Sequence, residues 1–232
     1  MYLALDLDGN RIPVWDAEKS QEYVCPVCQG KVIPRQGQVN SWHYAHITAC
    51  EDSWIYDMSD WHREWQEQFP LATREVVVEL QGERHRADFL AYGYVVEFQH
   101  SPITAEEFDR RNDFYVRAGY KVVWIFDFIE EYNVNKMTCY DEWHKRNDNG
   151  GKYKWLYPKR FLQNFKPSIE KNIIVFFQIC EADFGKEQEE SYMERVTWAI
   201  EYYGITDFKR FCTSYYPGNF QELLDWMENK KL

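Results

Sequence analysis

Residues 59–128 alternate between helix-like and strand-like segments in a fixed order, and this order constrains the fold more than any other feature of the chain. The first segment has tryptophans at helical spacing behind an N-cap at Ser59 or Asp60, and Pro70 closes it. Two strands of alternating polarity follow at 74–80 and 84–91, and then a strand at 93–99 that is apolar enough to lie centrally. A second helix at 104–119 and a nearly all-apolar strand at 120–128 complete the order. This order predicts an α+β protein with an α/β core.

The segments that flank this core predict three domains. Residues 3–14 alternate in polarity and turn at Asp8-Gly9, which is typical of a β-hairpin. After residue 132 the pattern predicts a strand, a longer helix and a short terminal helix, at 172–180, near 187–203 and near 219–229. The predicted domains are an N-terminal hairpin with a metal-binding module, the core, and a C-terminal α/β extension, over 1–56, 57–132 and 133–232.

Two acidic residues lie on successive strands of the predicted core. Asp88 lies toward the end of one strand and Glu97 lies on the next, and a turn at Gly93 lets the strands pair. Gln99 follows Glu97 by two residues and therefore shares its strand face. Carboxylates that converge at a sheet edge are ligands that magnesium prefers, and phosphodiester hydrolysis needs such a cation. The pair therefore predicts a magnesium site.

Glu97 interrupts a strand that is otherwise suited to burial. An unpaired buried carboxylate is costly, so we expect Glu97 to need a cation. Without metal, replacing Glu97 with alanine is then expected to raise thermal stability, because it removes a desolvated charge. The alternative is an edge strand with Glu97 and Gln99 facing water.

Motifs around these carboxylates resemble the nuclease domain of the competence protein CoiA-like family, within the PD-(D/E)XK superfamily. The motifs are S-D-W-H-R-E-W-Q at 59–66, R-A-D at 86–88, V-E-F-Q-H-S-P-I-T at 96–104, R-N-D-F-Y at 111–115 and V-V-W-I-F at 122–126. Together they cover about 59–128 in the element order of that superfamily. The resemblance implies a restriction-endonuclease-like αβββαβ core and a nuclease that cuts DNA with Mg²⁺ or Mn²⁺.

The family pattern also implies roles for individual residues. It assigns metal binding to Asp88 and Glu97, and Gln99 stands where many relatives carry lysine. A glutamine carries no charge, but it can orient water and donate a neutral hydrogen bond. His62 and Glu64 match family positions on the first helix. The resemblance implies a phosphate or water contact for His62 and a further metal-side carboxylate for Glu64, the alternative being a solvated helix face.

Nucleic-acid contacts are predicted near the carboxylates and in a basic stretch beyond the core. Arg111 lies on the helical stripe of Phe108 and Tyr115, so it faces inward and needs an anion, either a core carboxylate or the scissile phosphate. The other predicted contacts near the carboxylates are Arg86, His100 and Ser101. Residues 144–171 interleave basic and aromatic side chains, which suits phosphate contact and base stacking. Their predicted contacts are Lys152, Lys154, Lys159 and Arg160, the alternative being a connecting segment that packs on the core.

A second metal site is predicted over residues 25–50. Cys25-Pro-Val-Cys28 forms a knuckle, a tight turn that points two thiolates at one centre. The candidate ligands are Cys25, Cys28, His43, His46 and Cys50, five residues for four tetrahedral positions of zinc. Cys25, Cys28 and His46 are the core of the set, and either His43 or Cys50 completes it. Protein ligands at every position predict a structural zinc, and C-P-x-C with H-Y-A-H also resembles the N-terminal segment of the CoiA-like family.

The charge distribution bears on what such a protein binds. A formal net charge of -11 argues against a general nucleic-acid binder. Residues 1–132 carry that charge, with 12 basic against 23 acidic residues, whereas residues 133–232 hold 15 of each. No apolar run is long enough to span a membrane and the start lacks a signal-peptide pattern, so the six cysteines are interpreted as thiols or metal ligands in the cytoplasm.

These patterns together predict a Mg²⁺-dependent deoxyribonuclease. The expected partners are single- or double-stranded DNA and a protein that binds the zinc module. The second hypothesis is a non-catalytic DNA-binding or adaptor protein that retains the nuclease fold and serves DNA uptake, recombination or defence. The sequence leaves open the choice between endonuclease and exonuclease, RNA as a substrate, and the oligomeric state.

Overall fold

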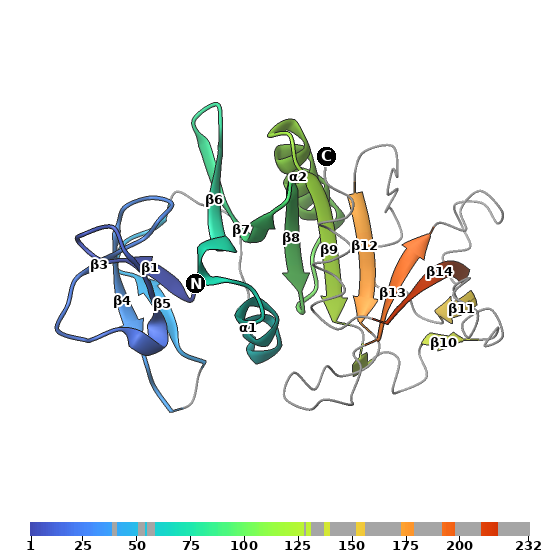
Figure 1. Cartoon of the computed structure of the whole chain (residues 1–232), viewed down its shortest axis with the longest axis horizontal. Helices are drawn as coiled ribbons and strands as arrows, with labels where there is room; N and C mark the ends of the chain where they lie inside the picture. Colours follow the sequence, from blue (N-terminus) through green and yellow to red (C-terminus); the bar gives the residue numbers. More distant parts are fainter. Residues whose placement is uncertain are drawn as a thin grey trace. The chain divides into compact units, whose positions relative to one another are not determined.

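The computed structural model describes most of the N-terminal half of the chain and five later strands. The described residues are 1–38, 41–50, 54, 59–127, 129–130, 137–139, 152–155, 173–178, 192–197 and 210–217. The chain divides into two compact units, Met1–Ala91 and Tyr92–Leu232 (Figure 1). The predicted domain boundaries near residues 56 and 132 stay predictions. Within the described residues, no helix is long and apolar enough to cross a membrane.

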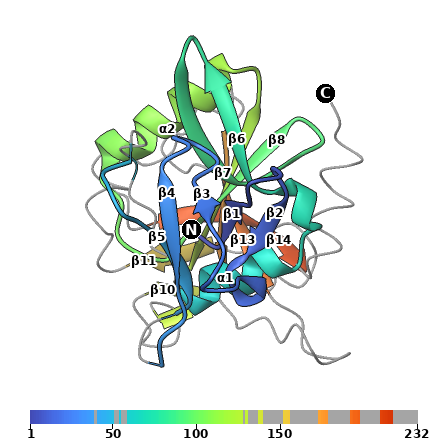
Figure 2. The ribbon, with the colours of Figure 1, turned by 90° about the vertical axis from the view of Figure 1, so that its left-hand side faces the viewer.

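The first unit begins with an antiparallel sheet of five short strands in the order β2-β1-β3-β4-β5 (Figure 2). The strands are β1 (Leu3–Leu5), β2 (Arg11–Pro13), β3 (Tyr23–Val24), β4 (Lys31–Arg35) and β5 (His43–His46), with a 3-10 turn, η1 (Val14–Asp16), after β2. The predicted hairpin is confirmed, because β1 pairs with β2 and Gly9 turns the chain at a φ of +82°. Such a φ is readily accessible only to glycine.

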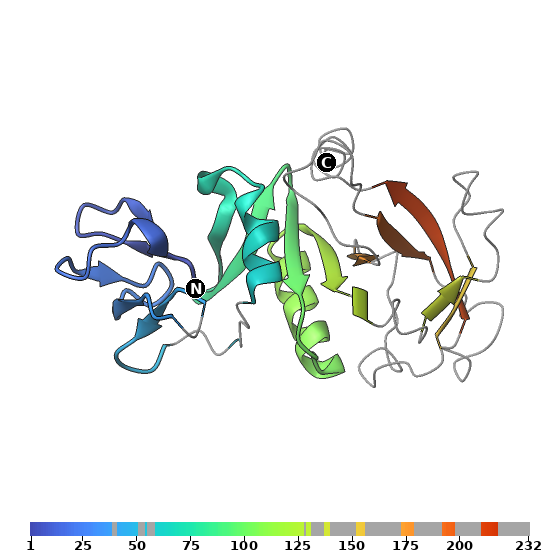
Figure 3. The ribbon, with the colours of Figure 1, turned by 90° about the horizontal axis from the view of Figure 1, so that it is seen from below.

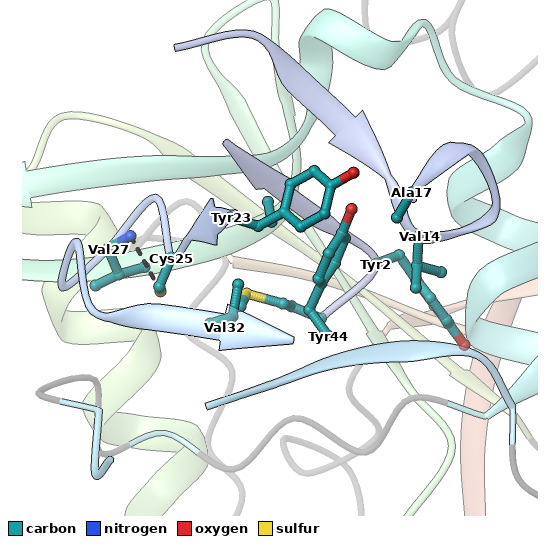
Figure 4. Close-up of a cluster of buried hydrophobic side chains, with 10 residues drawn as sticks. Tyr2, Val14, Ala17, Tyr23, Cys25, Val27, Val32 and Tyr44 are labelled. Atoms are coloured by element: carbon teal, nitrogen blue, oxygen red, sulfur yellow. Dashed lines mark hydrogen bonds between the residues drawn. The ribbon is translucent and has the colours of Figure 1, made fainter. Parts of the chain in front are cut away.

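A small core of tyrosine and aliphatic side chains holds this sheet together (Figure 4). The rings of Tyr23 and Tyr44 lie 5.3 Å apart and tilted, a favourable arrangement for aromatic pairs. Cys25 and Val27 are buried in the same cluster, and the Val27 N–H donates to Cys25 Sγ at 3.3 Å. The first cysteine of the knuckle is therefore built into the core of the module.

Helix α1 (Asp60–Glu67) follows, and its predicted cap is confirmed. The Ser59 hydroxyl accepts a hydrogen bond from the His62 N–H at 3.2 Å, which satisfies one of the backbone donors at the helix start. The helix buries one face, formed by His62, Trp65 and Gln66. A 3-10 turn, η2 (Leu71–Thr73), leads from α1 to the next strand.

Strands β6 (Arg74–Leu80) and β7 (Glu83–Ala91) confirm the two strands predicted there, and they pair as an antiparallel hairpin. The two turn residues, Gln81 and Gly82, both have positive φ, as the two-residue turns that match strand twist require. Leu80 lies opposite Glu83 in the resulting register.

The second unit contains strand β8 (Tyr94–Gln99), helix α2 (Ala105–Arg117) and strand β9 (Lys121–Asp127), all as predicted (Figure 3). Strands β8 and β9 are parallel, and α2 is the crossover between them. The Thr104 hydroxyl caps α2 by accepting from the Glu107 N–H at 3.1 Å, and Gly119 ends it at a φ of +93°. The helix packs on β9 through Phe108, whose ring lies 4.7 Å from that of Trp124.

Five more strands extend this sheet from β9. Strand β12 (Ile173–Gln178) pairs parallel with β9, which confirms the strand predicted there. Strands β13 (Tyr192–Thr197), β14 (Arg210–Pro217), β11 (Lys152–Trp155) and β10 (Met137–Cys139) then follow in antiparallel order.

The helix predicted near 187–203 is wrong over residues 192–197, which form strand β13 between β12 and β14. Tyr192, Val196 and Thr197 favour strands, and two partner strands supply backbone hydrogen bonds that a local pattern does not reveal. The terminal helix predicted near 219–229 lies outside the described residues.

Candidate functional site

Helix α1 and strand β7 bring three buried polar side chains together around Asp88. The imidazole Nε2 of His62 lies 3.0 Å from Asp88 Oδ1. The Gln66 amide nitrogen donates to the same oxygen at 3.3 Å and to the Asp88 backbone carbonyl at 3.4 Å. It also lies 3.2 Å from His62 Nε2. All three side chains are at most 3% exposed.

The structure brings His62 to Asp88, but it does not bring Glu64 there. Glu64 lies on the exposed face of α1, 4.0 Å from the Arg63 guanidinium. Gln66 was not among the residues predicted from the sequence. It lies four residues after His62, a spacing that places both on the same helix face, but an amide at this position carries no chemical signal of its own.

Arg86 lies on the same strand as Asp88 but faces an internal anion. It is 4% exposed, and its Nε lies 3.8 Å from the buried carboxylate of Glu75. Glu75 also accepts hydrogen bonds from the backbone N–H groups of Tyr2 and Leu3, at 2.9 and 2.8 Å. Arg86 and Glu75 therefore link β7, β6 and the edge of β1 within the first unit. Glu75 adopts an unusual φ of +45°, and its role was not predicted.

The Glu97 carboxylate is buried in the second unit with a partner on each oxygen. The Arg111 guanidinium contacts Oε2 at 3.0 Å, and the Tyr115 hydroxyl donates to Oε1 at 2.9 Å. Both partners come from α2, whose inward stripe meets β8 here. The expected charge compensation of Glu97 is thus present within the protein, as a guanidinium. This corrects the expectation that its removal would stabilise the metal-free chain.

Of the two anions considered for Arg111, the structure provides a core carboxylate. Arg111 Nε also contacts Glu107 at 2.8 Å, and Glu107 in turn binds Arg110. Burial alone would raise the pKa of Glu107, but the hydrogen bonds from Arg111 and Arg110 outweigh it and hold the pKa below its ordinary value. The ionised network fixes Arg111 and, through it, Glu97.

Gln99 and His100 follow Glu97 but make different contacts. The Gln99 amide nitrogen donates to the Ser101 carbonyl at 2.6 Å. His100 Nδ1 lies 2.8 Å from an Asp127 carboxylate oxygen. Glu97 and Gln99 are in register with Trp124 and Phe126, so Asp127, the next residue of β9, points to the opposite face of the sheet. His100 thus contacts a residue on the other side of the sheet from Glu97.

The predicted basic contacts lie only partly in the described chain. Lys152 and Lys154 belong to strand β11, which pairs with β14 and β10. Lys159 and Arg160 lie outside the described residues.

The cysteine–histidine group gathers at one end of the first unit's small sheet. It consists of Cys25, Cys28, His46 and Cys50, whose ligand atoms all lie within 4.8 Å of one another. His43 is not among them, and its Nδ1 lies 2.8 Å from the Ser41 carbonyl. The structure therefore brings Cys50, rather than His43, to the three ligands that the sequence favoured.

The geometry of this group fits a tetrahedral ion. Cys28 Sγ lies 3.5 Å from His46 Nε2. With ordinary zinc–sulfur and zinc–nitrogen bonds, the corresponding edge of a tetrahedron is about 3.5 Å. The Gly30 N–H points at Cys28 Sγ, and a Cβ at this glycine would lie 3.2 Å from that sulfur. The donor set and the space around it are those of a zinc knuckle.

The electrostatics of the knuckle favour a bound cation. Burial raises the pKa of the Cys25 thiol, and it outweighs the lowering by the backbone N–H groups of Cys28 and Val27. A cation at the centre of the group would stabilise the thiolates and offset this cost. The knuckle also contacts the β6–β7 hairpin, because Arg84 donates to the Pro26 carbonyl between the two cysteines at 3.2 Å.

Comparison with known families matches two segments of the chain. Residues 10–53 match the N-terminal domain of competence protein CoiA, and residues 80–175 match the CoiA nuclease-like domain. The chain belongs to the CoiA-like family. The CoiA N-terminal match contains the whole cysteine–histidine group, and the nuclease-like match contains Asp88, Glu97, Gln99 and Arg111. Helix α1, with His62 and Gln66, lies between the two matched segments. No curated protein and no solved structure matches this CoiA-like chain.

Proposed function

We propose that this CoiA-like chain is a metal-dependent nuclease that hydrolyses DNA phosphodiester bonds. The proposal is carried by the burial of two carboxylates, Asp88 at 2% and Glu97 at 1% exposure, on successive strands of a nuclease-like domain. Buried carboxylates are costly unless a partner or a function retains them, and a pair of them suits the binding of a divalent cation.

The turn between the two strands supports convergence of the carboxylates. Tyr92 and Gly93 join β7 to β8 and have φ values of +55° and +79°. Two central residues with positive φ are typical of type I′ turns, which join antiparallel strands. Asp88 and Glu97 lie equally far from this turn in the sequence, as expected of two carboxylates on successive strands that bind one cation.

We extend the proposal to the fold. The elements α1, β6, β7, β8, α2 and β9 follow one another in the helix, strand, strand, strand, helix, strand order of the PD-(D/E)XK core. On this proposal the knuckle module precedes that core and binds a structural zinc through Cys25, Cys28, His46 and Cys50.

Each residue of the proposed site has a definite task. Mg²⁺ or Mn²⁺ held by Asp88 and Glu97 would supply positive charge beside the scissile phosphate. Arg111 and Tyr115 hold the Glu97 carboxylate in a fixed orientation through its two oxygens. The contact with the Ser101 carbonyl holds the Gln99 amide by its nitrogen, so its oxygen is the atom that would orient the attacking water.

One observation favours a second candidate function, a DNA-binding or adaptor protein that does not cut. Both carboxylates already have protein partners: Arg111 and Tyr115 at Glu97, and His62 and Gln66 at Asp88. A site whose charges are compensated internally can be stable without any cation.

A paired assay separates the two functions. Labelled single- and double-stranded DNA and RNA are incubated with the purified protein in Mg²⁺, Mn²⁺ or chelator, and cleavage and binding are measured on the same samples. A nuclease cleaves at least one substrate in a metal-dependent manner. Binding without cleavage under every metal condition would favour the adaptor function and contradict the nuclease proposal.

A further inference from the structure

We infer that His62 and Gln66 are ligands, together with Asp88, of the divalent cation, and that the site therefore prefers Mn²⁺ to Mg²⁺. This inference rests on the proposed metal-dependent function and deepens it by naming the ligands and the metal. His62 would provide Nε2, Asp88 would provide Oδ1, and Gln66 would provide its amide oxygen.

The first argument is the size of the triangle that the three side chains form. His62 Nε2 and Asp88 Oδ1 lie 3.0 Å apart, and the Gln66 amide nitrogen lies 3.2 and 3.3 Å from them. Adjacent ligands of an octahedral cation with bonds of about 2.1 Å lie about 3.0 Å apart. The His62 and Asp88 ligand atoms thus already have the spacing of adjacent octahedral ligands, and the Gln66 amide is held by hydrogen bonds close to the third position.

The second argument is the position of the Gln66 amide. Its nitrogen contacts Asp88 Oδ1 and the Asp88 backbone carbonyl, so the positive end of the amide faces two oxygens. A cation would favour the same position, because both oxygens carry partial or full negative charge. Rotation of the amide by half a turn would exchange its nitrogen for its oxygen at nearly the same place. In the cation-bound state Gln66 would then face the metal with an acceptor.

The third argument is the shared framework of the ligands. His62 and Gln66 are one turn apart on α1, and the cap from Ser59 fixes the start of that helix. Asp88 lies on β7, which pairs with β6 in the same unit. Ligands on regular elements with little freedom to move lose little entropy when they bind a cation.

The ligand chemistry determines which metal is expected. Magnesium prefers an all-oxygen shell, whereas an imidazole nitrogen raises the affinity for first-row transition metals. A set of one imidazole, one carboxylate and one amide oxygen suits Mn²⁺ better than Mg²⁺.

The test uses the zinc-loaded protein with Mn²⁺ as the probe, so that the cysteine site is already filled. Mn²⁺ affinity is measured by electron paramagnetic resonance titration, and electron spin-echo modulation detects any nitrogen bound to the manganese. The wild type is expected to show ¹⁴N coupling, and His62→Ala should lose it and bind Mn²⁺ at least about 10-fold more weakly. His85→Ala is the matched control, because His85 is also buried beside a carboxylate, Glu83, and should leave the coupling intact.

A second variant keeps the test decisive if His62→Ala does not fold. Gln66→Glu places a carboxylate at the third position and should bind Mn²⁺ more tightly than the wild type. Mn²⁺ binding that requires Asp88 but shows no nitrogen coupling, or coupling that survives in His62→Ala, would overturn the inference and leave the proposed function standing. A wild type that binds neither Mn²⁺ nor Mg²⁺ would overturn both.

Discussion

Replacing Glu97 with alanine is expected to destabilise the metal-free protein, although the sequence alone suggests the opposite. The substitution removes the carboxylate that contacts Arg111 at 3.0 Å and accepts from the Tyr115 hydroxyl at 2.9 Å. Arg111 is 4% exposed, so water cannot replace the lost partner. The variant leaves a buried guanidinium with one of its two anions missing.

The size of the effect follows from this geometry. Breaking a buried ion pair by removing one partner costs about 3–5 kcal/mol. Arg111 keeps its contact with Glu107 at 2.8 Å, so the low end of that range, about 3 kcal/mol, is expected. In a chain of this size each 1 kcal/mol shifts the thermal midpoint by about 2–4 °C, which gives a fall of about 6–12 °C.

Thermal unfolding of the zinc-loaded protein in buffer prepared without Mg²⁺ or Mn²⁺ measures this fall. Glu106→Ala, in the same helical turn as Glu107 but exposed, is the matched control and should change stability by no more than about 0.5 kcal/mol. The double variant Glu97→Leu with Arg111→Met removes both charges together and should recover much of the lost stability, because apolar residues replace a buried pair at little cost. An unchanged or higher midpoint in Glu97→Ala would refute the reasoning.

Three further predictions concern the other charged groups and the knuckle. The pKa of Glu107 is lowered in the folded protein, so its ionised carboxylate contributes to the free energy of unfolding. This contribution is complete above the usual pKa of 4.5 and is lost as the pH falls through the pKa of the folded state. In urea unfolding between about pH 3 and 6, Glu107→Gln should therefore reduce the fall of stability at acid pH. Elemental analysis should find one zinc per chain in the wild type and in His43→Ala but much less in Cys50→Ser, and equal loss in the two variants would contradict the four-ligand set. If the basic stretch contacts DNA, neutralising the charges of Lys152, Lys154, Lys159 and Arg160 together should weaken DNA binding and reduce its dependence on salt concentration. An unchanged salt dependence would place the DNA path elsewhere.

The sequence predicted the core elements well because their signals are local. Ser59 caps the first helix as predicted, and Thr104 and Gly119 stand at the two predicted ends of the second. The strand over 192–197 was mistaken for a helix because its identity depends on two partner strands distant in sequence. Local propensity is a weak guide where tertiary pairing decides.

The sequence singles out the residues of the candidate site but not their contacts. Glu97 stands out because it interrupts an apolar strand, and Asp88 because it lies on the strand before it; both are buried. That Arg111 contacts the Glu97 carboxylate depends on how α2 packs against β8, which the helical stripe alone left open. Gln66 and Glu75 gave no chemical signal in the sequence, because a buried amide and a buried ion pair are defined by their neighbours.

The most direct test of the central claim compares cleavage by the wild type with cleavage by Asp88→Asn. Labelled DNA is digested under single-turnover conditions with Mn²⁺ and with Mg²⁺, and Glu79→Gln, an exposed acidic residue on the adjoining strand, is the control. We expect metal-dependent cleavage by the wild type and the control, and its loss by at least about 100-fold in Asp88→Asn with the fold and the zinc content intact. Cleavage by Asp88→Asn at the wild-type rate would contradict the assignment of this carboxylate to the site.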